Sequence, residues 1–146
     1  IDANNFTKKD MVKKILCVLP EKVEGEIVTI FGVTFKPNTD DIREAPSLLI
    51  IPSLQEKGAT VRVVDPQGKK EGKNILKNVV WFDDPYEASK SSSVIVILTE
   101  WNEFRALTPL SFTELMAGNV LVDLRNVYDP SAIRAANIHY TSIGRT

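Results

Sequence analysis

The sequence predicts a doubly wound α/β fold, in which helices cover both faces of a mostly parallel sheet of six strands. Hydrophobic segments of strand length alternate along the chain with segments of helical periodicity, which is typical of strand–helix–strand crossover units. Two of the hydrophobic segments, Ile27–Val33 and Val94–Leu98, are nearly continuous. Continuous runs indicate strands that are buried on both faces, as in a parallel sheet between helices.

An N-terminal helix is expected to precede the sheet, over about Asn5–Leu19. Its apolar residues recur on one face and lysines occupy the other. Thr7 and Asp10 have the spacing of a capping pair at its start. We expect this helix and the polar connector after it, residues 1–24, to stand apart from an α/β domain over residues 25–146.

Strands and helices are then expected in alternation, an order similar to that of the Rossmann fold. The expected strands are Ile27–Val33, Thr60–Val64, Val79–Phe82, Ser93–Leu98, Asn119–Leu124 and Ile138–Ser142. The expected helices between them are Pro46–Lys57, Asp84–Ser91, Thr108–Ala117 and Pro130–Ala136. Gly58 and Gly118 each follow a helix, where a left-handed C-terminal cap favours glycine. Gln67–Asn78, rich in Lys and Gly, is expected to be an exposed loop.

Composition excludes several classes of function. The 146 residues suffice for one domain with a core, and a net charge of −1 leaves no basic excess for nucleic acid or an anionic membrane surface. No apolar run approaches the roughly 20 residues that span a bilayer. The single cysteine excludes an internal disulfide and a multi-cysteine metal site. The expected compartment is the cytoplasm.

Two cations follow predicted strand ends, where ligands bind in open α/β sheets. Lys36 follows the first strand and Arg125 the fifth. A lysine with an arginine suits a diphosphate, provided that the two strands lie close together in the sheet. From the residues alone a second interpretation stays open, namely surface ion pairs with Asp40, Asp41 or Asp123.

Other polar residues have less specific interpretations. Acidic residues before a helix usually cap it, and we expect this of Asp40 and Asp41 rather than metal binding or acid–base chemistry. Arg43 either reaches a ligand outside the domain or neutralises these aspartates. Cys17 is expected to be a small buried hydrophobe on the apolar helix face, and His139 to be structural.

The turn after the first strand, Gly32–Lys36, is not the glycine-rich dinucleotide fingerprint, and the chain has no Walker loop. Trp101 and Phe104 are expected to be packing residues at the start of a helix. The residues alone therefore support an α/β nucleotide- or phosphate-binding domain without a defined specificity.

Four segments, in order along the chain, carry a family resemblance. They are FGVTFKPNTDDIREAPS (residues 31–47), GATVRVVDP (58–66), SSVIVILTEWNEFR (92–105) and NVLVDLRNVYDP (119–130). Together they resemble the C-terminal domain of the UDP-glucose/GDP-mannose dehydrogenase family. The resemblance covers nearly the whole chain, and the first segment is specific on its own.

The resemblance implies an oxidoreductase of which this chain is one part. Full enzymes of the family have an N-terminal NAD-binding domain, a central helical region and this domain, and they oxidise a sugar C6 alcohol to a carboxylate in two NAD-dependent steps. The reaction proceeds through a thiol adduct on a cysteine in a glycine-rich motif of the central region. That motif is missing here, so Cys17, within KKILCVLPE, is not expected to be catalytic. The chain alone is expected to be inactive, and the helix Asn5–Leu19 resembles the tail of the central region.

Site residues follow from the matched motifs. Phe35 and Lys36 resemble the pair that contacts the nucleotide sugar, and Arg125 the second cationic substrate contact. Arg43 resembles the arginine that crosses a domain interface to the NAD. The resemblance implies no catalytic residue and no metal ligand in this chain. The segment TEWNEF, residues 99–104, is more similar to the UDP-glucose branch than to the GDP-mannose or N-acetylated-sugar branches.

The expected partners are a UDP-sugar and the remaining domains of the same enzyme, which the family architecture makes a homodimer or a higher oligomer. Three alternatives remain. The chain could be a stand-alone nucleotide-binding or interaction module, or part of a dehydrogenase for GDP-mannose or a UDP-N-acetyl sugar. A glycosyltransferase domain would need an acidic metal-binding pair at a strand end, and Asp40 and Asp41 are better explained as a helix cap.

Overall fold

A computed structural model of the chain describes residues 7–34 and 36–143. Within these ranges one six-stranded sheet has the order β3-β2-β1-β4-β5-β6, and every neighbouring pair is parallel. The strands are β1 (Ile27–Phe31), β2 (Thr60–Val64), β3 (Val80–Phe82), β4 (Val94–Ile97), β5 (Val120–Asp123) and β6 (His139–Ser142). The helices are α1 (Lys8–Val18), α2 (Ser47–Glu56), α3 (Lys69–Ile75), α4 (Pro85–Ser89), α5 (Asn102–Arg105), α6 (Pro109–Leu115) and α7 (Pro130–Ala135).

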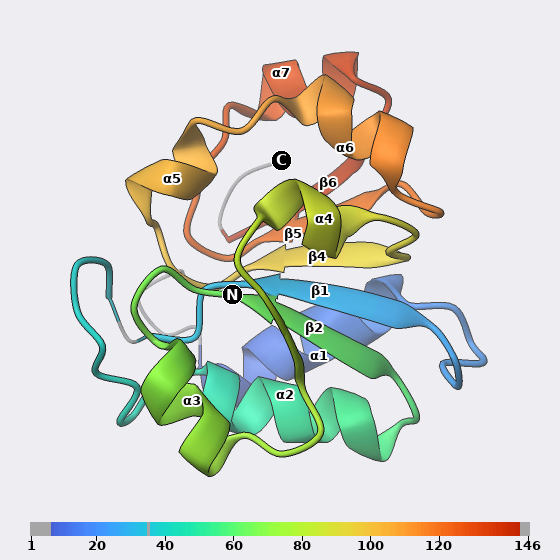
Figure 1. The fold of residues 1–146 in the computed structure, drawn as a ribbon. Helices are drawn as coiled ribbons and strands as arrows, with labels where there is room; N and C mark the ends of the chain where they lie inside the picture. The colour runs from blue at the N-terminus through green and yellow to red at the C-terminus, as the bar shows by residue number, and fades with distance from the viewer. Residues whose placement is uncertain (1–6, 35, 144–146) are drawn as a thin grey trace.

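Helices cover both faces of the sheet, which confirms the predicted doubly wound, Rossmann-like class. α1, α2 and α3 lie on one face and α4, α6 and α7 on the other (Figure 1). The strand order runs outward in both directions from the neighbours β1 and β4, so the topological switch point lies between them. Ligands of open α/β sheets bind beyond the carboxyl ends of the strands at this point.

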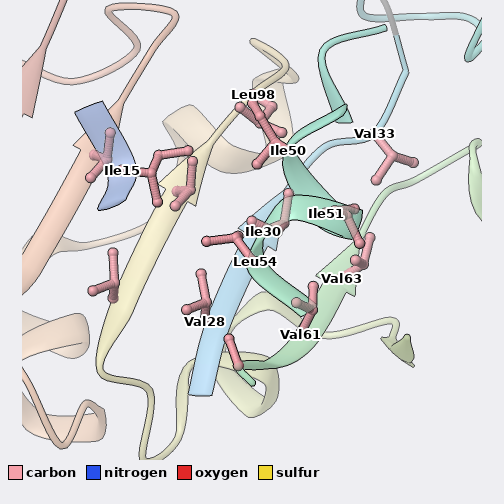
Figure 2. Packing of buried hydrophobic residues seen from close by; sticks show 14 of the residues in the cluster. Ile15, Val28, Ile30, Val33, Ile50, Ile51, Leu54, Val61, Val63 and Leu98 are labelled. Atoms are coloured by element: carbon pink, nitrogen blue, oxygen red, sulfur yellow. The ribbon is translucent and has the colours of Figure 1, made fainter. Parts of the chain in front are cut away.

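Side-chain alternation along each strand divides the interior into two cores. Val28 and Ile30 of β1 point toward α2 and pack with its buried Ile50 and Leu54 (Figure 2). Phe31, the next residue of β1, enters the core on the opposite face. Because both cores are apolar, the central strands are hydrophobic at nearly every position, as the continuous runs of the sequence predict.

The second core is rich in aromatic residues. Phe31 stacks on Phe104 with 5.0 Å between the ring centroids, and Phe112 lies 5.8 Å from Phe31. Trp101 is 2% exposed and belongs to the same cluster. The prediction that Trp101 and Phe104 are packing residues at the start of a helix is confirmed, since Trp101 is the N-cap residue of α5 and the buried Phe104 lies in its single turn.

The first helix begins as the sequence predicts and differs at its cysteine. The Thr7 hydroxyl accepts a hydrogen bond from the Asp10 N–H, and the Asp10 carboxylate accepts one from the Thr7 N–H, which completes a capping box. The prediction that Cys17 is buried is wrong: it is exposed. Cys17 lies three and four residues after Lys14 and Lys13, so it falls on the lysine face rather than on the face that buries Ile15.

Two further local predictions are wrong. The expected loop over Gln67–Asn78 contains helix α3, because Gly72 packs against the Trp81 ring where any Cβ would collide. Gly58 has the expected positive φ of 98°, but Gly118 lies outside the left-handed region. Gly118 is required for a different reason, namely that a Cβ there would meet the Ser93 carbonyl group.

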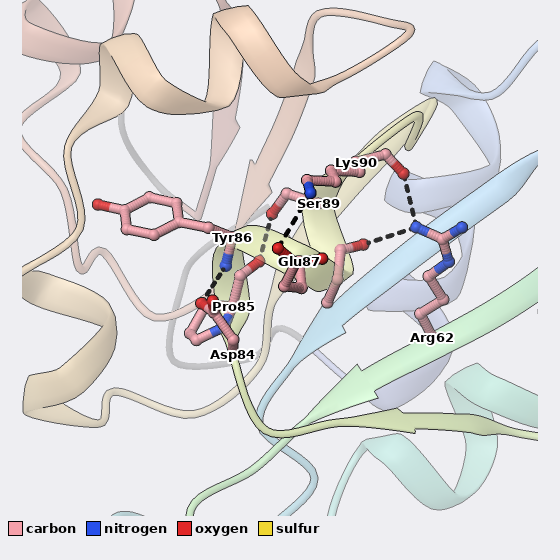
Figure 3. A network of polar contacts seen from close by, with 8 residues as sticks. Arg62, Asp84, Pro85, Tyr86, Glu87, Ser89 and Lys90 are labelled. Carbon is pink, nitrogen blue, oxygen red and sulfur yellow. Dashed lines mark hydrogen bonds and ion pairs between the residues drawn. The ribbon is translucent and has the colours of Figure 1, made fainter.

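Helix α4 is fastened at both ends (Figure 3). The Asp84 carboxylate accepts a hydrogen bond from the Tyr86 N–H at its start. The guanidinium of Arg62 on β2 donates to the carbonyl groups of Ala88 and Lys90 at its end, at 3.2 and 2.6 Å. Helix α4 therefore packs on β1, β2 and β3, and its end leads into the amino end of β4, opposite the switch-point loops. No helix among residues 7–34 and 36–143 is long and apolar enough to cross a membrane.

Candidate functional site

The loops that follow β1, β4 and β5 meet at the carboxyl edge of the sheet. In Figure 1 the loop after β1 is drawn in cyan, close to α3. β4 lies between β1 and β5 in the sheet. Since neighbouring strands are separated by roughly 4.8 Å, the ends of β1 and β5 lie about 10 Å apart, with the end of β4 between them.

A buried carboxylate fixes the loop after β1. Asp65 follows β2 directly and is 7% exposed. One of its oxygens accepts the N–H groups of Val33 and Thr34 at 2.7 and 3.2 Å. The other accepts the N–H groups of Gln67 and Gly68 at 2.9 and 2.6 Å. The loops after β1 and β2 are therefore joined through one side chain.

Threonine side chains connect the loop after β1 to β4. The buried Thr99 hydroxyl donates to the Thr34 carbonyl oxygen at 2.7 Å, and the Thr34 hydroxyl donates to the Lys36 carbonyl oxygen at 3.0 Å. The turn is close because Gly32 has a φ of 96°, and a Cβ there would overlap Thr99. The backbone of Lys36 is thereby held at the switch point, while its side chain is exposed.

A second buried carboxylate organises the loop after β5. Asp123 is fully buried and accepts the N–H groups of Arg125 and Tyr128, at 3.2 and 2.9 Å, and the Tyr140 hydroxyl at 2.7 Å. Burial, and then the charge of Asp123, raise the pKa of Tyr128. Arg125 Nε donates to the Leu98 carbonyl oxygen at 2.8 Å, so this loop is also attached to the end of β4.

The sheet order therefore meets the condition on which the diphosphate interpretation depended. Lys36 and Arg125 follow strands on either side of β4, and both of their loops are hydrogen-bonded to the residues that follow it. No ion pair of Lys36 occurs within the described ranges. Two cations separated by one strand can meet a single anionic ligand that lies over the end of β4.

Arg43 lies in the same loop but is engaged with a neighbour. Its Nε and one terminal nitrogen donate to the two oxygens of Asp41, at 3.0 and 3.1 Å. These hydrogen bonds hold the pKa of Asp41 below its ordinary 3.8, and the charge of Lys36 adds to the effect. The Arg43 side chain is 86% exposed, and exposed ion pairs are weak, so the guanidinium can exchange Asp41 for another partner.

The two aspartates of this loop do not cap a helix, contrary to the expectation. Helix α2 begins after Pro46, whose side chain provides no cap. Asp41 instead accepts the Arg43 N–H at 2.9 Å in a local turn. Asp41 is too far from α2 to cap it, because five loop residues separate it from the start of the helix at Ser47. Phe35, the remaining predicted site residue, lies outside the described residues.

The sequence did not indicate the buried residues whose hydrogen bonds fix the loop after β1, namely Asp65 and the threonines Thr34 and Thr99. One signal was available for Asp65, since an aspartate after a hydrophobic strand and before Pro-x-Gly favours a turn in which the carboxylate binds backbone N–H groups. The threonine contacts depend on the strand order and have no local signal. No group of His, Cys, Asp and Glu that could hold a metal occurs among the residues the structure describes.

The turn after β1 also indicates where a dinucleotide does not bind. In dinucleotide-binding sheets this turn offers its N–H groups to the pyrophosphate. Here the N–H groups of Val33 and Thr34 are directed at Asp65. These residues do not fit NAD.

Comparison with known proteins agrees with the geometry. Residues 29–130 match the UDP-glucose/GDP-mannose dehydrogenase family, UDP binding domain. The UDP-glucose 6-dehydrogenase of Rhizobium meliloti (strain 1021) is 37% identical over 145 residues, which are 99% of this chain and 33% of that protein. The UDP-glucose 6-dehydrogenase TuaD of Bacillus subtilis (strain 168) is 36% identical over 146 residues, 99% of this chain and 32% of that protein. The chain thus spans about a third of the length of these curated relatives.

Solved structures extend the likeness to the fold. The NDP-N-acetyl-D-galactosaminuronic acid dehydrogenase from Methanosarcina mazei Go1 superposes with a TM-score of 0.80 at 25% identity, over 97% of this chain and 30% of that one. A UDP-glucose dehydrogenase from Pyrobaculum islandicum superposes with a TM-score of 0.70 at 27% identity, over 95% of this chain and 29% of that one. Because the family match spans both cation-bearing loops and the strands between them, this chain belongs to the UDP-glucose/GDP-mannose dehydrogenase family and contains its UDP binding domain.

Proposed function

We propose that this chain is the C-terminal, nucleotide-sugar-binding part of an NAD-dependent UDP-glucose 6-dehydrogenase. The observation that carries the proposal is the position of Lys36 and Arg125, which follow strands on either side of β4 at the switch point. Identities of 37% and 36% to UDP-glucose 6-dehydrogenases, over 99% of the chain, support the substrate class.

Lys36 and Arg125 would hold the diphosphate of the UDP-sugar. The lysine supplies a point charge, and the arginine supplies a planar group whose orientation is set by its bond to Leu98. Phe35 would contact the nucleotide sugar beside Lys36. Arg43 would exchange Asp41 for the NAD bound by another domain.

Catalysis would require parts of the enzyme outside this chain. The NAD-binding domain and the catalytic cysteine would belong to those parts. The turn after β1 does not fit NAD, and it is the start of α1, through the Lys8–Glu44 ion pair, that lies near the loop after β1, whereas Cys17 is near the other end of α1. Residues 1–24 would form the tail of the central helical region, with the nucleotide-sugar-binding domain over 25–146. The whole enzyme would act in the cytoplasm as a homodimer or a higher oligomer.

An assay of NAD+ reduction tests this proposal. The whole protein should form two NADH per UDP-glucose, and the 146-residue chain alone should form none. Lys36→Ala and Arg125→Ala in the whole protein should each raise the KM for UDP-glucose. A whole protein that turns over GDP-mannose in preference to UDP-glucose would contradict the proposal.

A second candidate substrate has one specific observation in its favour. The likeness with a TM-score of 0.80 is to an enzyme named for an N-acetylated sugar. The alternative is therefore a UDP-N-acetyl sugar on the same diphosphate site. UDP-N-acetylglucosamine and UDP-N-acetylmannosamine belong in the same assay, and a kcat/KM above that of UDP-glucose for either would favour the alternative.

A further inference from the structure

Four backbone N–H groups converge on the carboxylate of Asp65. Val33 and Thr34 approach one oxygen from the loop after β1, and Gln67 and Gly68 approach the other from the loop after β2. Convergent backbone N–H groups form anion sites in proteins. The anion in this site is a side chain of the chain itself, and it is almost completely buried.

The same hydrogen bonds lead directly to Lys36. Asp65 fixes the N–H of Thr34, Thr99 binds the carbonyl group of Thr34, and the Thr34 hydroxyl binds the carbonyl group of Lys36. The N–H and the carbonyl group of Thr34 are therefore both anchored, to residues that follow β2 and β4. Loss of the Asp65 anchor would leave two N–H donors of a buried turn without an acceptor and would release the turn.

We propose that Asp65 is a positioning residue for UDP-sugar binding: an internal anion that occupies the backbone N–H site after β1 and thereby holds Lys36 over the end of β4. The proposal rests on the proposed function, in which Lys36 contacts the diphosphate. It also explains why a phosphate group has no access to the N–H groups of this turn, which face a carboxylate instead.

The first test uses Asp65→Asn, which has nearly the same shape. Its amide can accept hydrogen bonds through one oxygen only, so two of the four N–H groups face an NH2 group. The matched control is Thr29→Val, in the middle of β1. It removes a buried hydroxyl that donates to the carbonyl oxygen of Ala88 in α4, and it is expected to lower stability without changing the loop after β1. Calorimetric titration with UDP should give about tenfold weaker binding for Asp65→Asn and unchanged binding for Thr29→Val.

A double-mutant cycle separates positioning from general stability. If Asp65 acts through Lys36, Asp65→Asn should weaken UDP binding by about tenfold in the wild-type background and by less than about twofold in the Lys36→Ala background. Equal losses in the two backgrounds would overturn the proposal.

A measurement without UDP keeps the two proposals distinguishable. In Asp65→Asn, amide hydrogen exchange should accelerate at Val33, Thr34 and Lys36 beyond the acceleration found in Thr29→Val. Exchange at these amides equal to that of Thr29→Val would overturn the role of Asp65, whether or not UDP binds. A wild-type chain that fails to bind UDP would contradict the proposed function, while the exchange rates would still decide the role of Asp65.

Should Asp65→Asn not fold, Asp65→Ala with added formate replaces it. Formate has the carboxylate that the four N–H groups lack, so it should restore the thermal midpoint and the slow amide exchange of Asp65→Ala, whereas chloride at equal ionic strength should not. Equal effects of formate and chloride on this variant would contradict an anion site at Asp65.

Discussion

The Nε–H group of Arg125 donates a 2.8 Å hydrogen bond to the carbonyl oxygen of Leu98. Arg125 belongs to the loop after β5 and Leu98 follows β4, so the bond joins the ends of these two strands beside the switch point. A guanidinium is planar, and a bond at Nε limits its orientation relative to the end of β4. The proposed diphosphate contact depends on this orientation as well as on the charge.

Arg125→Lys should therefore weaken UDP binding although it keeps the charge. A lysine has no Nε–H and no planar group, so we expect about tenfold weaker binding, measured by calorimetry. Arg62→Lys is the control, because Arg62 also donates to backbone carbonyl groups but at the amino end of β4. If Arg125→Lys binds UDP as tightly as the wild type, the charge alone is sufficient and the Leu98 bond has no role in binding.

Tyr140→Phe should destabilise the fold by about 1–3 kcal/mol, the cost of removing a hydrogen-bond donor from a buried acceptor. The Tyr140 hydroxyl donates to Asp123, which is fully buried. Urea denaturation measures the free energy of unfolding. Tyr86→Phe is the control, since the Tyr86 hydroxyl accepts an exposed bond from the Thr108 N–H. Equal unfolding free energies for the two variants would contradict the role assigned to the Asp123 network.

Arg43→Gln should raise the pKa of Asp41 toward its ordinary 3.8. The pKa is held low by hydrogen bonds from the Arg43 side chain and backbone, and only the side-chain contribution is removed. A group with a depressed pKa stabilises the fold above its unfolded pKa, and the contribution is lost as the pH falls through the folded pKa. Carboxyl NMR between pH 2 and 6 follows the titration. An unchanged pKa of Asp41 in the variant would mean that the pair does not form in solution.

Strands and their order along the chain were predictable because burial on two faces leaves a continuous hydrophobic signal. All six expected strands are found, within one or two residues at their ends. The position of Lys36 and Arg125 at strand ends was predictable for the same reason, since each follows such a run. That Lys36 and Arg125 lie on either side of β4 was not predictable, because this depends on the strand order, which no local pattern encodes.

The errors have local physical causes. Helix α3 was missed because Gly72 within it, like the Gly68 that precedes it, is a poor helix former, and the packing of Gly72 on Trp81 outweighs that preference. Cys17 was expected on the apolar face of α1. Because one helical turn takes 3.6 residues, its side chain points toward the exposed lysine face instead. Asp41 was expected to cap α2, but a short turn closed by Arg43 competes for its carboxylate. For α3 and Asp41, a contact with a particular partner decided the outcome.

The central claim is that this chain binds the nucleotide of a UDP-sugar through Lys36. Calorimetric titration with UDP, with GDP as the comparison, tests it most directly, and Lys90→Ala is the control for the loss of an exposed lysine at the other end of β4. The account predicts saturable UDP binding that GDP does not match, weakened by about 1.5–3 kcal/mol in Lys36→Ala and unchanged in Lys90→Ala. Equal binding of UDP and GDP, or UDP binding that is unaffected by Lys36→Ala, would contradict it.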